Sequence, residues 1–182
     1  MNMAVFGLFT FNVIALQGSL LLVIAHGITS GALFLLVGML YDRYKTKLVF
    51  YYSGLALGMP FFAFIFLFFS FCNIGFPGTM NFMSELLLFT GVVCYSISSQ
   101  SFVIVIFISI GLFSSVVYAI WLCNRLLFGN LKFYFTSAFI DINERELLVL
   151  LPFVFYILYF GINSFILKYT HLFIKCNLLI FT

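Results

Sequence analysis

The stretch NIGFPGTMNFMSELLLFTG (Asn73–Gly91) breaks an apolar region, Leu55–Tyr95, that is too long for one ordinary membrane span. Pro77 removes a helical hydrogen bond, and Gly75 and Gly78 loosen the backbone on either side of it. The region therefore forms either two full spans or one span with a broken helix. Unwound backbone inside a membrane is tolerated only where protein or water surrounds it, so a break here is a place where a polar site can form.

The composition indicates a membrane protein. The 182 residues are 65% hydrophobic, 21% aromatic and 7% charged, whereas soluble domains carry about 25% charged residues. The length leaves room for about four or five spans of ~20 residues and for no soluble domain. We therefore predict one all-α transmembrane domain over residues 1–182, a polytopic membrane helix bundle with one discontinuous helix, in contact with membrane lipids. The net charge of +3 is too small to indicate a nucleic-acid surface.

No motif supports cofactor or metal chemistry. The four cysteines are dispersed without a CxxC pair, and no zinc, haem or iron–sulfur spacing occurs. Neither a GxGxxG sequence nor a P-loop is present, and the two histidines have no companion acid that would suit Ser/His/Asp catalysis. We expect no cofactor, no metal and no catalytic residue in this chain.

The apolar runs predict a partial helix followed by complete crossings. The first run is too short to cross a bilayer alone. The runs are, in order, Met1–Phe11 (partial), Leu16–Tyr41, Leu55–Tyr95 (broken), Phe102–Phe128 and Leu147–Leu167.

The basic loops favour one broken helix over two full spans. Lys and Arg collect in loops on the cytoplasm-equivalent side of a membrane, and both DRYKTK (Asp42–Lys47) and Gly129–Glu146 are rich in them. A single broken helix between these loops places both on the same side, whereas two full spans would place them on opposite sides. We expect both loops to face that cytoplasm-equivalent side.

Glu85 is the only formally charged side chain between Lys47 and Arg125. An acid in hydrocarbon is unfavourable unless neighbours or protonation compensate it, so Glu85 indicates proton handling. The alternative is a permanently neutral acid, or one paired with a single lysine for assembly. Three polar residues are placed to satisfy backbone groups that the break frees: Asn73, Asn81 and Ser84.

His26 lies near the middle of the run Leu16–Tyr41 and can relay protons, because imidazole titrates near neutrality. The alternative is a neutral histidine bonded to a backbone carbonyl. Gly27 and Gly31 form a GxxxG pattern, which favours close helix packing. Hydroxyl groups on the face of His26 or in the run 102–128 either bond to their own helix or line a wet path; these are Thr29, Ser30, Ser114, Ser115 and Tyr118.

Four motifs, taken together, resemble the C-terminal part of subunit 4 of respiratory complex I, the NADH:ubiquinone oxidoreductase. That subunit is antiporter-like and related to the Mrp-type antiporters. Subunits 2 and 5 fit less well, since subunit 5 typically has a lysine where Glu85 stands. The motifs are AHGITSGALFLLVGMLYDRYKTK (Ala25–Lys47), NIGFPGTMNFMSELLLFTG (Asn73–Gly91), YAIWLCNRLLFG (Tyr118–Gly129) and NEREL (Asn143–Leu147).

The resemblance implies a part in proton translocation without redox chemistry in this chain. His26 matches the relay histidine of the AHG-type helix, and Glu85 matches the acid after the FPGT-type turn. In the family, such groups form a line across the membrane midplane, and quinone reduction in another subunit drives protons along it. The implied location is the mitochondrial inner membrane, with several crossings.

The resemblance covers only about the last third of the family protein, which sets an expectation about partners. We expect a split-gene product whose Met1 abuts a second polypeptide, the N-terminal part of the same subunit; a truncated or proteolytic piece is the alternative. Neighbouring antiporter-like subunits 2 and 5 are further expected partners. Two other functions stay open at this point: a structural membrane-arm fragment without pumping, and a fragment of a stand-alone cation/proton antiporter.

Overall fold

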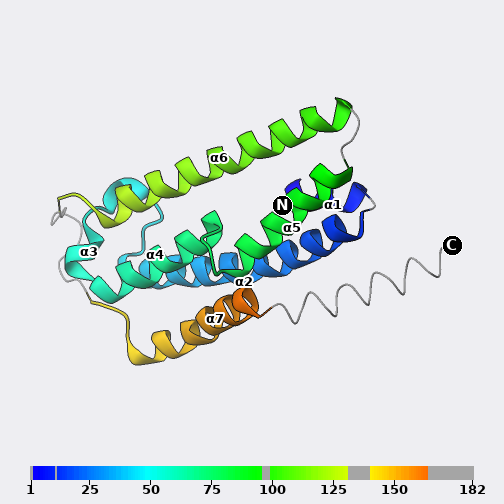
Figure 1. Cartoon of the computed structure of the whole chain (residues 1–182). Helices are drawn as coiled ribbons and strands as arrows, with labels where there is room; N and C mark the ends of the chain where they lie inside the picture. The colour runs from blue at the N-terminus through cyan, green and yellow to red at the C-terminus, as the bar shows by residue number, and fades with distance from the viewer. Residues whose placement is uncertain (1, 11, 96–98, 131–139, 164–182) are drawn as a thin grey trace.

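All regular elements that the structure describes are helices, as predicted. The computed structural model describes residues 2–10, 12–95, 99–130 and 140–163, the side chains of residues 94–104 excepted. Figure 1 shows the elements: α1 (Asn2–Phe9), α2 (Val13–Tyr44), the 3-10 helix η1 (Val49–Tyr51), α3 (Leu55–Gly58), α4 (Pro60–Ile74), α5 (Met80–Tyr95), α6 (Ser99–Leu127) and α7 (Glu144–Ile162).

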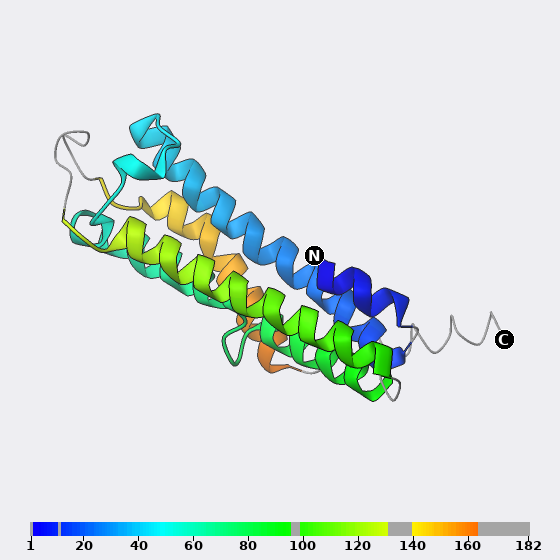
Figure 2. The same cartoon turned by 90° about the horizontal axis from the view of Figure 1, so that it is seen from above.

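Three of the described helices are long and apolar enough to cross a membrane: α2, residues 105–127 of α6, and α7. The helices α4 and α5 are shorter and follow one another across the predicted break. Figure 1 shows α6 along one side of the bundle and α7 on the other, with α2, α4 and α5 between them. Seen from above in Figure 2, α1 lies beside the N-terminal part of α2.

The break is a defined turn, because α4 ends in a Schellman motif. Gly75 has φ 86°, a left-handed conformation that favours glycine. Its N–H donates to the carbonyl of Cys72 at 3.2 Å, and the N–H of Phe76 donates to the carbonyl of Phe71 at 3.1 Å. The rings of Phe71 and Phe76 pack with centroids 6.2 Å apart. Gly75 is therefore required by a fixed turn, rather than loosening the chain as predicted.

A new helix begins immediately after this turn. Pro77 cannot continue α4, and Gly78 is again left-handed, with φ 91°. Thr79 precedes α5, and its hydroxyl donates to the carbonyl of Phe76 at 2.7 Å. The same oxygen accepts from the N–H of Phe82 at 3.5 Å, which gives α5 an N-terminal cap. The predicted discontinuous helix is thus present, with residues 75–79 as its interruption.

The start of the broken region contains a second interruption that the apolar pattern did not reveal. The helix α3 ends at Gly58, and Pro60 opens α4, where its missing N–H would be unpaired in any case. The carboxylate of Asp141 accepts from the N–H groups of Phe61 and Phe62 at 3.0 and 3.1 Å. This negative charge suits the N-terminus of α4.

The two basic loops lie at the same end of the bundle, as one broken helix requires. Arg43 forms an ion pair with Glu146 and donates to the carbonyl of Asp141 at 3.0 Å. Ser53 donates to the carbonyl of Asn130 at 2.7 Å. These contacts join the end of α2 to the start of α7, and the segment before α3 to the residues that follow α6.

The backbones of α2 and α5 approach one another closely, at glycines that the GxxxG pattern did not indicate. A Cβ on Gly18 would lie 2.5 Å from the backbone nitrogen of Leu88, and a Cβ on Gly91 would strike the backbone of Ala15. A Cβ on Gly27 would meet nothing within 4 Å, and one on Gly31 would meet only the Phe153 ring at 3.6 Å. Among the described residues, no helix backbone lies against this face of α2, so the packing role of Gly27 and Gly31 stays a prediction.

Candidate functional site

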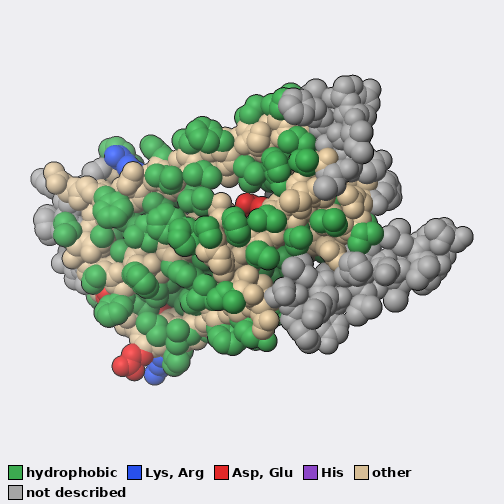
Figure 3. All heavy atoms as spheres, viewed as in Figure 1, with side chains coloured by type: hydrophobic (Ala, Val, Ile, Leu, Met, Phe, Trp, Pro, Cys, Tyr) green, Lys and Arg blue, Asp and Glu red, His purple; other side chains and the backbone are tan. Residues whose placement is uncertain are grey.

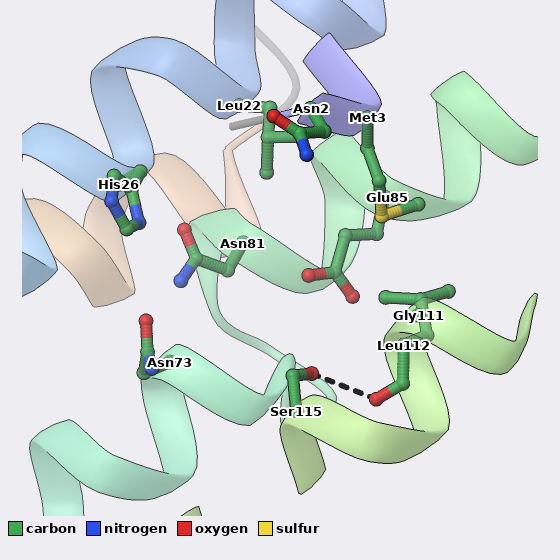
Figure 4. Close-up of a pocket in the computed structure, with 10 residues that line it drawn as sticks. All are labelled: Asn2, Met3, Leu22, His26, Asn73, Asn81, Glu85, Gly111, Leu112 and Ser115. Carbon is green, nitrogen blue, oxygen red and sulfur yellow. Dashed lines mark hydrogen bonds between the residues drawn. The ribbon is translucent and has the colours of Figure 1, made fainter. Parts of the chain in front are cut away.

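A cavity of about 430 Å³ lies where α1, α2, α4, α5 and α6 come together (Figure 4). It brings His26 of α2 and Glu85 of α5 to one space, although 59 positions of the numbering separate them. Six of its ten lining residues have polar side chains: Asn2, His26, Asn73, Asn81, Glu85 and Ser115.

The Glu85 side chain lies against the helix break. A Cβ on Gly75 would be 2.6 Å from Oε2 of Glu85 and 3.3 Å from its Cδ, so the carboxylate occupies space that only glycine leaves. Figure 3 shows acidic atoms at the bottom of a hollow between α6 and the helices beneath it. Among the described residues, Glu85 has no hydrogen-bond or ion-pair partner. An unpaired carboxylate at membrane depth requires water, a proton or a cation from elsewhere.

His26 joins this cavity to a second one of about 390 Å³. Both His26 and Asn73 line the two cavities. The second cavity extends to Val49 and Leu126, near the end of the bundle where the basic loops meet. Its polar lining consists of His26, Ser30, Ser70, Asn73 and Tyr118, and apolar side chains form the rest. Polar groups therefore continue from Glu85 past His26 toward that end.

The predicted hydroxyl groups divide between the cavities and other surroundings. Ser115 lines the first cavity, and Ser30 and Tyr118 line the second. Thr29 is 1% exposed and lines neither. Ser114 lines an outer groove with Phe113, Val117, Tyr118 and Trp121 instead.

Helical rotation explains why two of these residues differ from expectation. Neighbouring residues in a helix point about 100° apart, so Thr29 turns into the core where Ser30 faces the cavity. Ser114 likewise turns away from the cavity that Ser115 lines. Each serine donates to its own helix, Ser114 to the carbonyl of Gly111 at 2.9 Å and Ser115 to that of Leu112 at 2.7 Å.

One of the three polar residues near the break bonds a carbonyl at the break, as expected, and a second bonds a carbonyl within its own helix. Asn81 Nδ2 donates to the carbonyl of Cys72 at 2.8 Å, across the break. Ser84 donates to the carbonyl of Asn81 at 2.7 Å. Sequence reasoning missed Asn2 and Ser70, and the available signal was a polar residue inside an otherwise apolar run.

These features define a class: a polytopic membrane protein with a broken helix and, beside the break, an acid that has no partner among the described residues. Residues 1–117 match the family described as NADH:quinone oxidoreductase/Mrp antiporter, TM, and the chain belongs to this family. The matched residues include α1 to α5 and the first part of α6, and therefore the break, His26 and Glu85. The family inferred from the motifs is confirmed.

The similar proteins are complex I subunits. The chain is 45% identical over 168 residues to NADH-ubiquinone oxidoreductase chain 4 of Chondrus crispus, covering 91% of this chain and 33% of the relative. It is 39% identical over 176 residues to the chain 4 of Marchantia polymorpha, covering 97% of this chain and 33% of the relative. The chain thus spans about a third of the length of the curated relatives that it matches.

A solved structure supports the fold. The chain superposes on a chain of respiratory complex I from Thermus thermophilus, determined with bound NADH, with a TM-score of 0.77 and 27% identity. The match covers 95% of this chain and 36% of that one.

Proposed function

We propose that this chain forms the C-terminal part of a proton-translocating membrane-arm subunit of NADH:ubiquinone oxidoreductase and carries part of its proton path. The observation that supports this most directly is the cavity shared by His26 and Glu85 beside a broken helix. The chain's similarity to chain 4 of several organisms supports the assignment to that complex.

The proposed role of this chain is electrostatic, and redox chemistry takes place in other subunits. A change of charge at one group shifts the pKa of the next, and each pKa unit corresponds to about 1.36 kcal/mol. Moving one proton charge across ~180 mV requires roughly 4 kcal/mol. Coupled pKa shifts of about three units are therefore the scale that such a site must reach.

The proposed location is the mitochondrial inner membrane, with the two basic loops facing the matrix. The proposed partners are the N-terminal part of the same subunit and the neighbouring antiporter-like subunits 2 and 5. The relatives' greater length supports the first of these. Comigration with a very large NADH-oxidising complex on a native gel tests the assembly, and migration of the chain apart from that complex would contradict it.

The Glu85→Gln variant tests the proton role, because glutamine keeps the size of the side chain and removes its titration. We expect the complex to assemble, with reduced proton pumping and reduced coupled NADH oxidation. The measurement is the number of protons pumped per NADH in sealed vesicles that contain the complex.

The matched control is Glu144→Gln, which removes an exposed carboxylate in the first turn of α7, far along the chain from the cavity lining. We expect this variant to pump normally. Full pumping stoichiometry in Glu85→Gln would show that Glu85 is not an essential relay, and loss of assembly in that variant would favour a structural role.

A further inference from the structure

Asn81 lies in the first turn of α5, inside the polar lining of the first cavity. The residue is 3% exposed. Figure 4 shows its side chain in the region between the His26 ring and the Glu85 carboxylate. Both of those groups line the same cavity as Asn81.

The two ends of the Asn81 amide face different surroundings. Nδ2 donates to the carbonyl of Cys72 in the last turn of α4, at 2.8 Å. The same carbonyl accepts from the N–H of Gly75, which ends that helix. A carbonyl oxygen cannot donate, so the NH₂ group must be the end that faces Cys72. This bond joins the two halves of the broken helix.

The other end of the amide has no partner within the part of the chain that the structure describes. Oδ1 of Asn81 is buried and accepts no hydrogen bond from the described residues. A buried acceptor without a donor is unfavourable, and native structures rarely leave one. The cavity that Asn81 lines is polar and far larger than the space one water molecule needs. The partner that fits is therefore a hydrogen-bond donor inside the cavity.

We propose that Asn81 is a positioning residue of the proton path, and this rests on the proposed function above. Its NH₂ group holds the two halves of the broken helix together at the carbonyl of Cys72. Its Oδ1 accepts a hydrogen bond from a water molecule that lies between His26 and Glu85. One side chain thus fixes both the turn that places the Glu85 carboxylate and the water molecule beside that carboxylate.

Two variants of Asn81 test the proposal in the intact complex. Asn81→Leu keeps the branched shape and the number of side-chain heavy atoms and removes both hydrogen bonds, so we expect proton pumping to fall by about tenfold, the scale expected when a hydrogen bond is lost. We also expect faster deuterium exchange in peptides that contain residues 75–82. Ser84→Ala is the matched control: it removes a buried hydroxyl from the same turn of α5, outside the cavity lining.

Asn81→Asp separates positioning from a purely structural role by its pH profile. When protonated, the aspartic acid can still donate to Cys72 and present an oxygen to the cavity. As pH rises it loses that donor and gains a charge beside Glu85, so we expect coupled turnover to fall at high pH. His26 and Glu85 are the titratable groups of this lining, and both are also present in the wild type and in Ser84→Ala. Neither of those two proteins should therefore show the added pH dependence.

The results distinguish this proposal from the function on which it rests. If Glu85→Gln stops pumping while Asn81→Leu pumps at the wild-type rate, the proposal for Asn81 fails alone. A wild-type pH profile in Asn81→Asp would also overturn it. If Glu85→Gln pumps fully, the proposed function fails, whatever the Asn81 variants do.

Discussion

The contact between Gly75 and Glu85 shows how one residue can serve the fold and the site together. Gly75 adopts φ 86°, which ends α4, and its missing side chain leaves the space in which the Glu85 carboxylate lies. Gly78 is also left-handed, with φ 91°, but a Cβ there would meet nothing within 4 Å. The two glycines therefore share a backbone requirement and differ in their relation to the acid.

Gly75→Ala should impair pumping more than Gly78→Ala. Both changes place an L-residue in a left-handed conformation, which destabilises by about 1–2 kcal/mol. Only the first forces a methyl group against Glu85 Oε2. We expect similar losses of thermal stability in the two assembled complexes and a lower proton-to-NADH ratio in Gly75→Ala alone. Equal pumping by both variants would mean that the position of the carboxylate is not critical.

Residue chemistry made the site predictable only in part. Glu85 and His26 could be identified as candidates because a titratable side chain inside a membrane is energetically unfavourable, and such residues therefore usually have a function. The direction in which each residue of the surrounding helices points could not be predicted in the same way. Thr29 and Ser30 are equally polar, and only the packing of α2 decides that the first is buried in the core and the second lines a cavity.

At the scale of elements, α7 makes contact with the break from the side of the bundle opposite α6 (Figure 1). A Cβ on Gly161 would strike the Gly78 carbonyl oxygen and the backbone of Thr79 and Met80. The backbone of α7 therefore packs directly on the turn between α4 and α5. Such an approach requires a small residue, as in other membrane helix contacts.

Gly161→Ala should displace this turn and lower the stability of the assembled complex. The expected change is faster thermal inactivation of coupled NADH oxidation, since the clash is with backbone and cannot be relieved by a side-chain rotation. Gly38→Ala is the matched control, because a Cβ at that helical glycine would meet nothing within 4 Å. Equal inactivation rates for the two variants would show that the turn tolerates the displacement.

Element boundaries were predictable where local chemistry is strong and were missed where a cap extends a helix. The position of the break followed from Gly75 and Pro77. The start of α7 was expected at Leu147, but the structure begins it at Glu144, because Asn143 and Glu146 form a capping box that adds a polar turn. The predicted end at Leu167 lies outside the described residues.

At the scale of the whole molecule, polar contacts gather at one end of the bundle and around the break. At that end, Arg43 holds the loop before α7 through Glu146 and the carbonyl of Asp141, while the Asp141 carboxylate caps α4. At the other end of α4 lies the turn on which α7 packs. The segment from Asp141 to Gly161 therefore contacts α4 at its start and the break at its end. This arrangement fixes the depth of the break relative to the loop end.

The arrangement also predicts which positions share a side of the membrane. Single cysteines at Lys47 and Asn130, in a chain whose native cysteines are replaced by serine, should react with an impermeant maleimide from the same side. A cysteine at Thr10, at the opposite end of α2, should react only from the other side. If the matrix orientation is correct, the first two react in inside-out vesicles and the third in mitoplasts. Labelling of positions 47 and 130 from opposite sides would mean that α4 and α5 are separate crossings, and Glu85 would then lack the broken helix on which the proposed proton path depends.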